Sequence, residues 1–287
     1  MRVSISGAIV ANEDKWLYDY FDIPNTCPAE IRDAIEATPE GDTLTVEINS
    51  GGGDMFAGFE MYSILRQAAC PTVAEVQSLA ASAASTAMIG CDTVLLSPVA
   101  QVMIHMAITE TRGNEDAHRE SLRALESFFV SILNGYELRC GAKCDRATLE
   151  RYVRQSTWIP VQDAVAMGIA DGILGGGENL SMDVHVVNAA SGILGGLQTP
   201  TRGALLDEYH RRVANGAAPA EGHEIAAAVI PADIDDLLVN NCPSPSDILA
   251  QMPAADNSPP TGEANPASTS WRDHAALALQ YEKIKFL

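Results

Sequence analysis

The sequence predicts an α/β fold with parallel strands, because its apolar positions alternate between the strand period and the helix period up to about residue 185. Hydrophobic residues make up 47% of the 287 residues and charged residues 20%, which is ample for a packed core. We therefore predict one large domain over residues 1–180, followed by a distinct C-terminal region over residues 181–287.

The expected elements follow from the spacing of apolar residues. Strands are predicted at 2–10, 43–48, 72–77, 92–96 and 101–105, and helices at 28–37 and 56–67. A long amphipathic helix is then expected from Asn114 to Gly141. Asn114 and the acidic residues after it suit the positive N-terminal end of a helix, and Gly141 suits its end.

The C-terminal region has a different amino-acid composition. Segments such as "PAADNSPPTGEANPASTS" are rich in Pro, Gly, Ala, Ser and Asn. This composition buries too little apolar area to offset the entropy of ordering, so a mostly flexible tail with a few short helices is expected. The final "WRDHAALALQYEKIKFL" is interpreted either as a docking helix or as a simple amphipathic end.

Charge and cysteine usage exclude several classes. The formal net charge of −20 argues against binding to nucleic acid and to anionic membrane surfaces. The N-terminus lacks a signal-peptide pattern, and no stretch reaches the roughly 20 apolar residues of a membrane span. Six scattered cysteines suggest reduced thiols in the cytoplasm. Cys140 and Cys144 lack a second ligand pair, so neither a metal site nor a cofactor is predicted.

Three consecutive glycines stand in "EINSGGGDMFAG", between an apolar strand and a helix. Such a loop exposes backbone N–H groups that can bind a phosphate or the oxyanion of a tetrahedral intermediate. A phosphate loop needs a lysine after the glycines, whereas Asp54 and Met55 follow here. The oxyanion interpretation and a purely structural glycine turn both remain open.

The segment "SLAASAAS" places three serines, Ser78, Ser82 and Ser85, among alanines. It is either a tight helix-packing patch or a nucleophile segment with small neighbours. Ser82 falls where a strand turns into a helix, so its hydroxyl is the best placed of the three. The N–H of Ala83 could then join the glycine loop in stabilising an oxyanion. Ser78 is expected on the strand, and Ser85 in a packing or hydrogen-bonding role.

A serine nucleophile needs a base. "QVMIHMA" places His105 at the end of a predicted strand, 23 positions after Ser82. A lone histidine on an apolar strand is more often a core residue, but this one stands between core-like segments. The other histidines are expected on an exposed helix face or at the edge of, or beyond, the compact part; they are His118, His185, His210, His223 and His274. Glycine loop, serine and histidine, each at a strand end, together favour acyl-transfer chemistry.

These motifs resemble those of the ClpP-type serine peptidases. "INSGGGDMFAG" is similar to the family's Asn-Ser-Pro-Gly-Gly loop, "SLAASAAS" to its nucleophile segment and "VMIHM" to its histidine strand. "STWIPVQDAVAMGIAD" resembles the segment that closes the core domain. The likeness extends over Met1 to Gly175 and is greatest to the ClpP-like head maturation proteases of tailed phages.

The resemblance implies a crotonase-like fold of repeated ββα units. It implies Ser82 as nucleophile and His105 as base, with Gly52, Gly53 and Ala83 around the oxyanion hole. It also implies that the long helix is the family's handle, through which subunits associate into rings.

Two positions depart from the family pattern. Gly51 replaces the proline of the loop, which a glycine turn accommodates. Ser156 stands where the third member of the triad, an aspartate, is expected, so Ser156 could give His105 a hydrogen bond but no charge. Another carboxylate could serve instead, and the candidates near it in the sequence are Asp145, Glu150 and Asp163.

The leading hypothesis is a serine endopeptidase that processes scaffold or capsid proteins during phage head maturation. It would act as a homo-oligomer in the host cytoplasm or inside the assembling head. An ATPase partner has no support in the sequence, because the chain has no nucleotide-binding motif.

Three alternatives are kept. A scaffold protein with a weakened or inactive site follows from the missing aspartate. A crotonase-type acyl-CoA enzyme would need a catalytic carboxylate and basic residues for the CoA phosphates, which are not evident. A Ser/Lys peptidase would need a lysine near Ser82, and none of the four lysines falls at such a motif; they are Lys15, Lys143, Lys283 and Lys285.

Overall fold

A computed structural model of the protein describes residues 1–176, 187–188 and 200–223. Its contacts group Met1–Ala226 into one compact unit and Ala227–Leu287 into a second. The second unit, with the amphipathic segment predicted at 271–287, lies outside the described residues. The predicted domain boundary at residue 180 stays a prediction.

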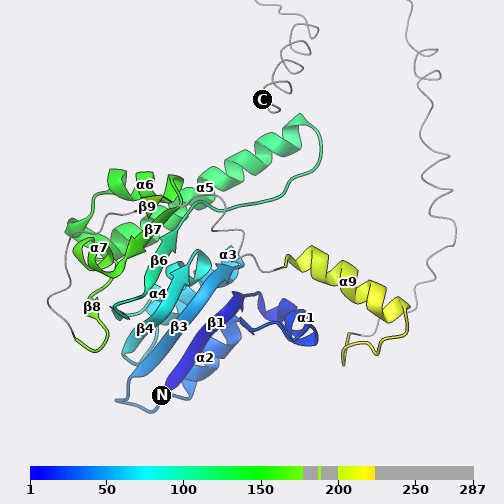
Figure 1. Ribbon diagram of the computed structural model, residues 1–287, viewed down its shortest axis with the longest axis horizontal. Helices are drawn as coiled ribbons and strands as arrows, with labels where there is room; N and C mark the ends of the chain where they lie inside the picture. Colours follow the sequence, from blue (N-terminus) through cyan, green and yellow to red (C-terminus); the bar gives the residue numbers. More distant parts are fainter. Residues whose placement is uncertain (177–186, 189–199, 224–287) are drawn as a thin grey trace, which may run out of the picture. The chain divides into compact units, whose positions relative to one another are not determined.

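A single sheet brings together the strands of the described part of the chain. Its order is β2-β1-β3-β4-β6-β7-β9, and β5 pairs with β4 and β8. The strands are β1 (Arg2–Ile9), β2 (Asn25–Thr26), β3 (Leu44–Gly53), β4 (Thr72–Ala81), β5 (Thr93–Leu96), β6 (Gln101–Ile104), β7 (Thr157–Pro160), β8 (Gly172–Ile173) and β9 (Val187–Asn188). Figure 1 shows β1, β3 and β4 running side by side.

The predicted α/β class with parallel strands is confirmed for the pairs that involve β1 to β6 and β8. The exceptions are at one edge, where β7 runs antiparallel to β6 and β9 antiparallel to β7. The strands β3 and β4 are longer than predicted. They continue through the glycine loop and through Ala81, so both motifs begin on sheet strands.

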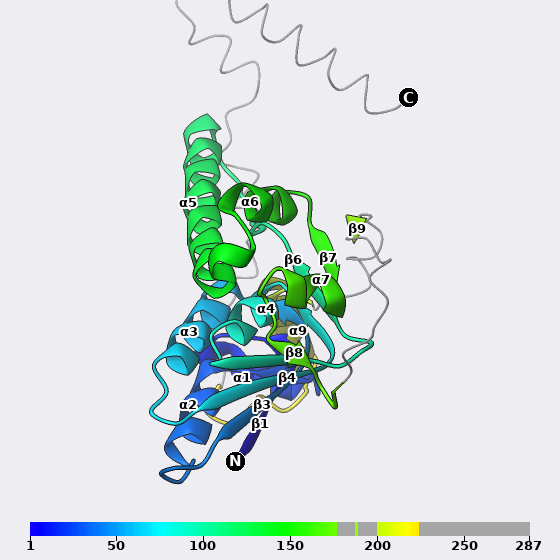
Figure 2. The same ribbon diagram turned by 90° about the vertical axis from the view of Figure 1, so that its left-hand side faces the viewer.

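Helices connect and cover the strands. They are α1 (Lys15–Tyr20), α2 (Pro28–Glu36), α3 (Met55–Arg66), α4 (Ala83–Met88), α5 (Glu115–Cys140), α6 (Arg146–Arg154), α7 (Val161–Ala166) and α9 (Arg202–Ala214), with short 3-10 turns at Asn12–Asp14 and Gly141–Lys143. The helices predicted at 28–37 and 56–67 are confirmed as α2 and α3. Figure 2 shows both on the same side of β1, β3 and β4.

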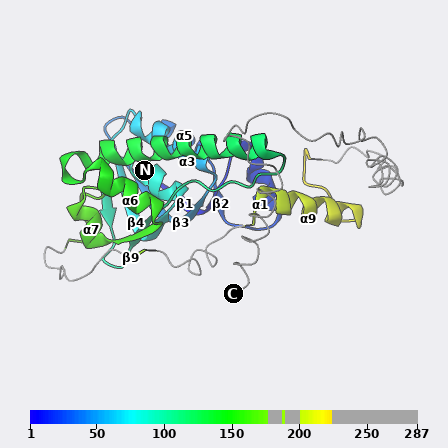
Figure 3. The same ribbon diagram turned by 90° about the horizontal axis from the view of Figure 1, so that it is seen from above.

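The long helix α5 has the limits that its end signals predict. The Asn114 side chain accepts a hydrogen bond from the Ala117 N–H at 3.1 Å, and Gly141 at the other end has a φ of +55°. A side-chain acceptor at the first turn and a glycine with positive φ at the last are strong helix boundaries. Figure 3 shows α5 as one continuous helix with α6 beside it.

The main core lies between the sheet and helices α2 to α5. Apolar side chains of the central strands are fully buried there, among them Val46, Ile48 and Val76. The alanines of α4 fill the space behind them, since Ala84 and Ala87 have no exposed surface. Small side chains let this short helix lie close to the strands, which is what the alanine-rich segment contributes to packing.

A second apolar cluster joins the two helices at opposite ends of the described chain. Leu17 and Tyr18 of α1 are buried together with Leu205 and Tyr209 of α9. His223 stacks on Trp16 with ring centroids 3.8 Å apart. His223, which the sequence places at the edge of the compact part or beyond it, is exposed and lies near the end of the unit Met1–Ala226. The four-residue spacing of Leu205 and Tyr209 gives α9 an apolar face to bury.

Candidate active site

Ser82 occupies a sharp turn between β4 and α4. Its backbone angles are φ 54° and ψ −125°, a sparsely populated conformation for a residue with a side chain. Holding such a conformation costs about 1–3 kcal/mol, and nucleophilic serines at strand-to-helix elbows have this feature. The Ser82 N–H donates to the Met103 carbonyl of β6 at 2.9 Å, which ties the turn to the neighbouring strand.

The other two serines of the segment have the roles expected of them. Ser78 lies on β4, where its hydroxyl is 2.5 Å from Asn49 Oδ1 on β3. Ser85 is fully buried in α4 and forms hydrogen bonds there. Of the three hydroxyls, only that of Ser82 contacts His105.

His105 directly follows β6, and Ser82 directly follows the neighbouring strand β4, so the two residues lie close together. The distance from His105 Nε2 to Ser82 Oγ is 2.7 Å, a short hydrogen bond. The tautomer with an unprotonated Nε2 accepts the Ser82 proton, which is the geometry that a general base requires. The structure therefore brings together the two residues that the sequence singled out for nucleophile and base.

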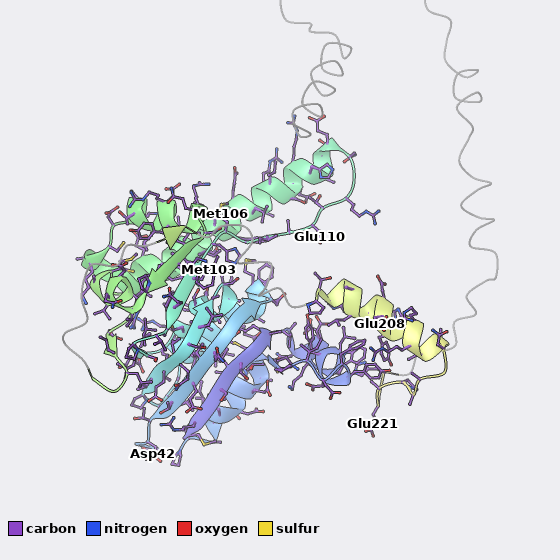
Figure 4. All side chains as sticks on the ribbon, viewed as in Figure 1. Asp42, Met103, Met106, Glu110, Glu208 and Glu221 are labelled. Atoms are coloured by element: carbon purple, nitrogen blue, oxygen red, sulfur yellow. The ribbon has the colours of Figure 1, made fainter. Side chains whose placement is uncertain are left out.

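The environment of His105 keeps its imidazole neutral. Burial lowers the pKa of His105, and an interaction with the backbone of Met106 acts in the opposite direction. Figure 4 labels Met103 and Met106, which flank His105 in the chain. A base with a lowered pKa is unprotonated at neutral pH and ready to accept a proton, but it is also a weaker base.

Ser156 directly precedes β7, at the end of the sheet where His105 follows β6. Ile104 pairs with Thr157 in the antiparallel pair of β6 and β7, so the next residues outward are His105 and Ser156. Among the described residues, no hydrogen bond joins the Ser156 hydroxyl to His105. Ser156 has a φ of +52°, and its N–H donates to the Val153 carbonyl at 3.3 Å.

The alternative carboxylates are occupied elsewhere or lie in other elements. Asp145 accepts the Thr148 N–H at the start of α6, at 2.9 Å. Glu150 forms an ion pair with Arg154 at 3.0 Å. Asp163 lies in the first turn of α7. No carboxylate of the described chain shifts the pKa of His105, so the imidazolium formed in catalysis would lack a charged partner.

The glycine loop lies directly against the Ser82 turn. A Cβ atom added to Gly52 would be 2.7 Å from the Ser82 Cβ and 2.9 Å from the Ala83 nitrogen. One added to Gly53 would be 2.1 Å from the Ile9 carbonyl oxygen. With φ angles of +95° and +153°, both positions require glycine.

The amides near Ser82 have different partners. The Gly52 N–H donates to Ser50 Oγ at 3.0 Å, so in this structure that amide is engaged within the loop. The Ala83 N–H is the first of α4, and the first amides of a helix have no intrahelical acceptor. Asp54, which argued against phosphate binding, caps α3 by accepting the Ala57 N–H at 2.7 Å.

A pocket of about 610 Å³ opens over Ser82 and His105. Its lining is apolar on one side, where Phe56 and Phe128 meet edge to face with ring centroids 5.3 Å apart. Asp14 and Arg202, which form an ion pair, also line it. The size suits a peptide segment with at least one apolar side chain.

Two further features concern metal ligands and membrane-spanning helices. Across the described ranges, no group of three or more His, Cys, Asp or Glu residues is arranged to hold a metal ion. Among the helices that the structure describes, none has the length and apolar character needed to cross a membrane.

The fold and the serine–histidine pair define an α/β protein with the layout of a hydrolase. Comparison with known proteins also indicates a hydrolase. The model of the Clp protease family matches residues 33–176, which is half of the chain. The chain belongs to the Clp protease family, a family of peptidases.

Curated relatives are ATP-dependent Clp protease proteolytic subunits. Subunit 1 of Chlamydia muridarum is 26% identical over 148 residues, which cover 49% of this chain and 74% of the relative. Subunit 1 of Chlamydia abortus is 27% identical over the same length and the same shares. The subunit of Porphyromonas gingivalis is 24% identical over 146 residues, or 49% of this chain and 63% of the relative.

The close approach of the glycine loop predicts a large effect of Gly52→Ala. The added methyl group would displace Ser82 or Ala83, and a shift of about 1 Å at reacting groups can cost on the order of 100-fold in rate. We expect kcat/KM for a peptide substrate to fall about 100-fold. Gly41→Ala is the matched control, because Gly41 also has a positive φ, +84°, but no atom lies within 4 Å of its added Cβ. Equal losses in both variants would contradict the contact argument.

Proposed function

We propose that the protein is a serine endopeptidase of the ClpP type that cleaves scaffold or capsid proteins during phage head maturation. The observation that carries the peptidase part is the 2.7 Å contact between Ser82 Oγ and His105 Nε2 beside the glycine loop. The phage part rests on the resemblance of the Ala-Ala-Ser-Ala-Ala-Ser segment and remains a proposal.

The reaction would be acyl transfer. His105 takes the Ser82 proton as the oxygen attacks a peptide carbonyl, and then returns it to the leaving amine. The Ala83 N–H and the amide of Gly53 stabilise the oxyanion of the tetrahedral intermediate. Water, activated by His105 in the second half of the reaction, releases the acyl group and restores Ser82.

The long helix α5 supports a proposal about assembly. Three of its large apolar side chains are strongly exposed, namely Leu122 at 61%, Val130 at 47% and Leu138 at 76%. Exposed apolar side chains along one helix favour contact with another protein surface. We propose that α5 is the handle through which copies of this chain form a homo-oligomer.

One observation favours a second candidate. Within the ranges that the structure describes, no carboxylate shifts the pKa of His105, so a scaffold protein with a weakened or inactive site on the same fold is the alternative. The two candidates differ in whether Ser82 is an activated nucleophile.

Labelling with a fluorophosphonate probe, mapped by mass spectrometry, tests this difference. We expect the full-length protein to be labelled at Ser82, because the probe reacts with serines activated by a base. Ser82→Ala should abolish labelling. Ser78→Ala is the matched control and should leave it unchanged, since the Ser78 hydroxyl contacts Asn49 instead of His105. Absence of labelling in the wild-type protein would favour the scaffold candidate.

The phage role is tested separately. Co-expression with the capsid and scaffold proteins of the same genome should yield shortened forms with the wild-type chain and uncut forms with Ser82→Ala. Labelling without any shortened form would leave a peptidase whose substrates lie outside head assembly.

A further inference from the structure

A hydrogen-bonded pair of buried side chains supports the turn at Ser82. Neither residue of the pair belongs to the predicted triad or to the glycine loop. Ser85 of α4 and Tyr136 of α5 are both buried, with 0% and 1% of their surfaces exposed. Their oxygens are 2.6 Å apart. The same Ser85 Oγ lies 2.7 Å from the Ser82 carbonyl oxygen and 3.2 Å from the Met103 carbonyl oxygen.

The direction of these hydrogen bonds follows from counting protons. A serine hydroxyl has one proton to donate, and a backbone carbonyl can only accept. The Ser85 proton therefore goes to a carbonyl, and the Ser82 oxygen at 2.7 Å is the nearer one. Tyr136 is then the donor to Ser85, and the result is a chain of hydrogen bonds from Tyr136 through Ser85 to the Ser82 carbonyl.

Holding that carbonyl orients the amide on the other side of the same peptide bond. The Ser82 carbonyl and the Ala83 N–H belong to one planar trans peptide, so they point in opposite directions. Hydrogen bonds from the Ser85 N–H at 3.0 Å and the Thr86 N–H at 3.2 Å reach the same carbonyl. With the carbonyl directed into α4, the Ala83 N–H is directed out of the helix start.

We propose that Tyr136 and Ser85 are positioning residues that fix the Ser82–Ala83 peptide so that the Ala83 N–H faces the oxyanion; this rests on the proposed peptidase function. The strained backbone of Ser82 makes such support necessary, because a turn of this kind persists only where its surroundings impose it. The Met103 carbonyl, two residues before His105, accepts from the Ser82 N–H and is also reached by Ser85 Oγ. The pair thus lies where nucleophile, oxyanion amide and histidine strand meet.

Burial gives the pair a defined protonation state. Burial raises the pKa of Tyr136, and its hydrogen bonds with Ser85 and Thr86 act in the opposite direction. The hydroxyl therefore remains protonated over the range in which His105 titrates. A change at Tyr136 should consequently alter the rate without moving the pH midpoint set by His105.

The test replaces Tyr136 by Phe, which removes the hydroxyl and keeps the ring. Losing a direct oxyanion donor costs roughly 100- to 1000-fold in kcat, so loss of a group that positions one should cost less. We expect kcat for a peptide ester to fall about 10-fold with KM within twofold. The affinity for a peptide boronate, whose tetrahedral adduct places an oxygen in the oxyanion hole, should fall in parallel. The pH midpoint of kcat/KM should stay unchanged.

Tyr209→Phe is the matched control. Tyr209 is also 1% exposed, and its hydroxyl donates to the His223 carbonyl at 2.7 Å in the other apolar cluster. It should lower the melting temperature in the same way while leaving kcat unchanged. Ser85→Ala is a second variant, and combining it with Tyr136→Phe should add little, because the two residues act as one unit.

The outcomes separate this inference from the function on which it rests. An active wild-type protein in which Tyr136→Phe and Ser85→Ala change kcat no more than Tyr209→Phe would overturn the positioning role alone. A wild-type protein without turnover or labelling would overturn the proposed function and the positioning role with it. A loss of kcat in the Tyr136 and Ser85 variants, matched by weaker boronate binding, supports both.

Discussion

Replacing His105 by Ala is expected to lower kcat/KM for a peptide substrate by about 10²- to 10³-fold, less than in a complete triad because His105 has no carboxylate partner in the described chain. In serine peptidases the loss of the base alone costs nearly as much as the loss of the whole catalytic unit, because serine is a poor nucleophile without it. His105 is the only base within hydrogen-bond distance of Ser82 Oγ in the described chain. Steady-state kinetics with the purified full-length protein measure this loss.

The pH dependence provides an independent readout. The base acts only when neutral, so wild-type activity should fall as the pH drops through the pKa of His105, which burial places below its ordinary value of 6.5. The residual activity of His105→Ala should show no such midpoint. His118→Ala is the control, because His118 lies on α5 with its Nδ1 3.1 Å from Thr111. A His105→Ala protein that keeps more than a hundredth of the activity would contradict the assigned base.

Elements with strong local signals could be predicted from the sequence. The limits of α5 follow from Asn114 and Gly141, since a side-chain cap and a glycine with positive φ are read from single residues. The meeting of Ser82 and His105 could also be predicted. Both follow strands of one parallel sheet, and the carboxyl ends of parallel strands lie at the same edge.

Contacts between distant segments could not be predicted in this way. Tyr136 lies 51 residues from Ser85, and nothing in the pattern of α5 distinguishes it from other apolar core positions. The packing of α9 on α1 was missed for the same reason. The apolar spacing of Leu205 and Tyr209 was a usable signal, but the surrounding Pro- and Gly-rich composition concealed it. The hydrogen bond from the Gly52 N–H to Ser50 Oγ also depends on side-chain geometry. A single sequence does not encode that geometry, so it does not tell which backbone amides are free.

The second large expected effect is a gain of activity in Ser156→Asp, because no carboxylate of the described residues shifts the pKa of His105. The antiparallel pair of β6 and β7 ends at Ile104 and Thr157, so His105 and Ser156 lie at the same end of this pair. Ser156 has a φ of +52°, a conformation that aspartate tolerates better than most residues. A carboxylate there would stabilise the imidazolium formed when Ser82 attacks. Removing the corresponding charge from a triad costs about 10⁴-fold in kcat, so we expect Ser156→Asp to raise kcat by roughly 10- to 1000-fold.

The charge makes this prediction specific. Ser156→Asn is the matched control, because it has the same size and the same tolerance for positive φ but no charge. A nearby negative charge favours the protonated imidazole, so Ser156→Asp should raise the pKa of His105. The pH midpoint of kcat/KM should therefore move upward in Ser156→Asp and stay in place in Ser156→Asn. If the two variants have equal kcat and equal midpoints, position 156 does not reach His105. The lowered pKa of His105 would then be independent of the charge at position 156.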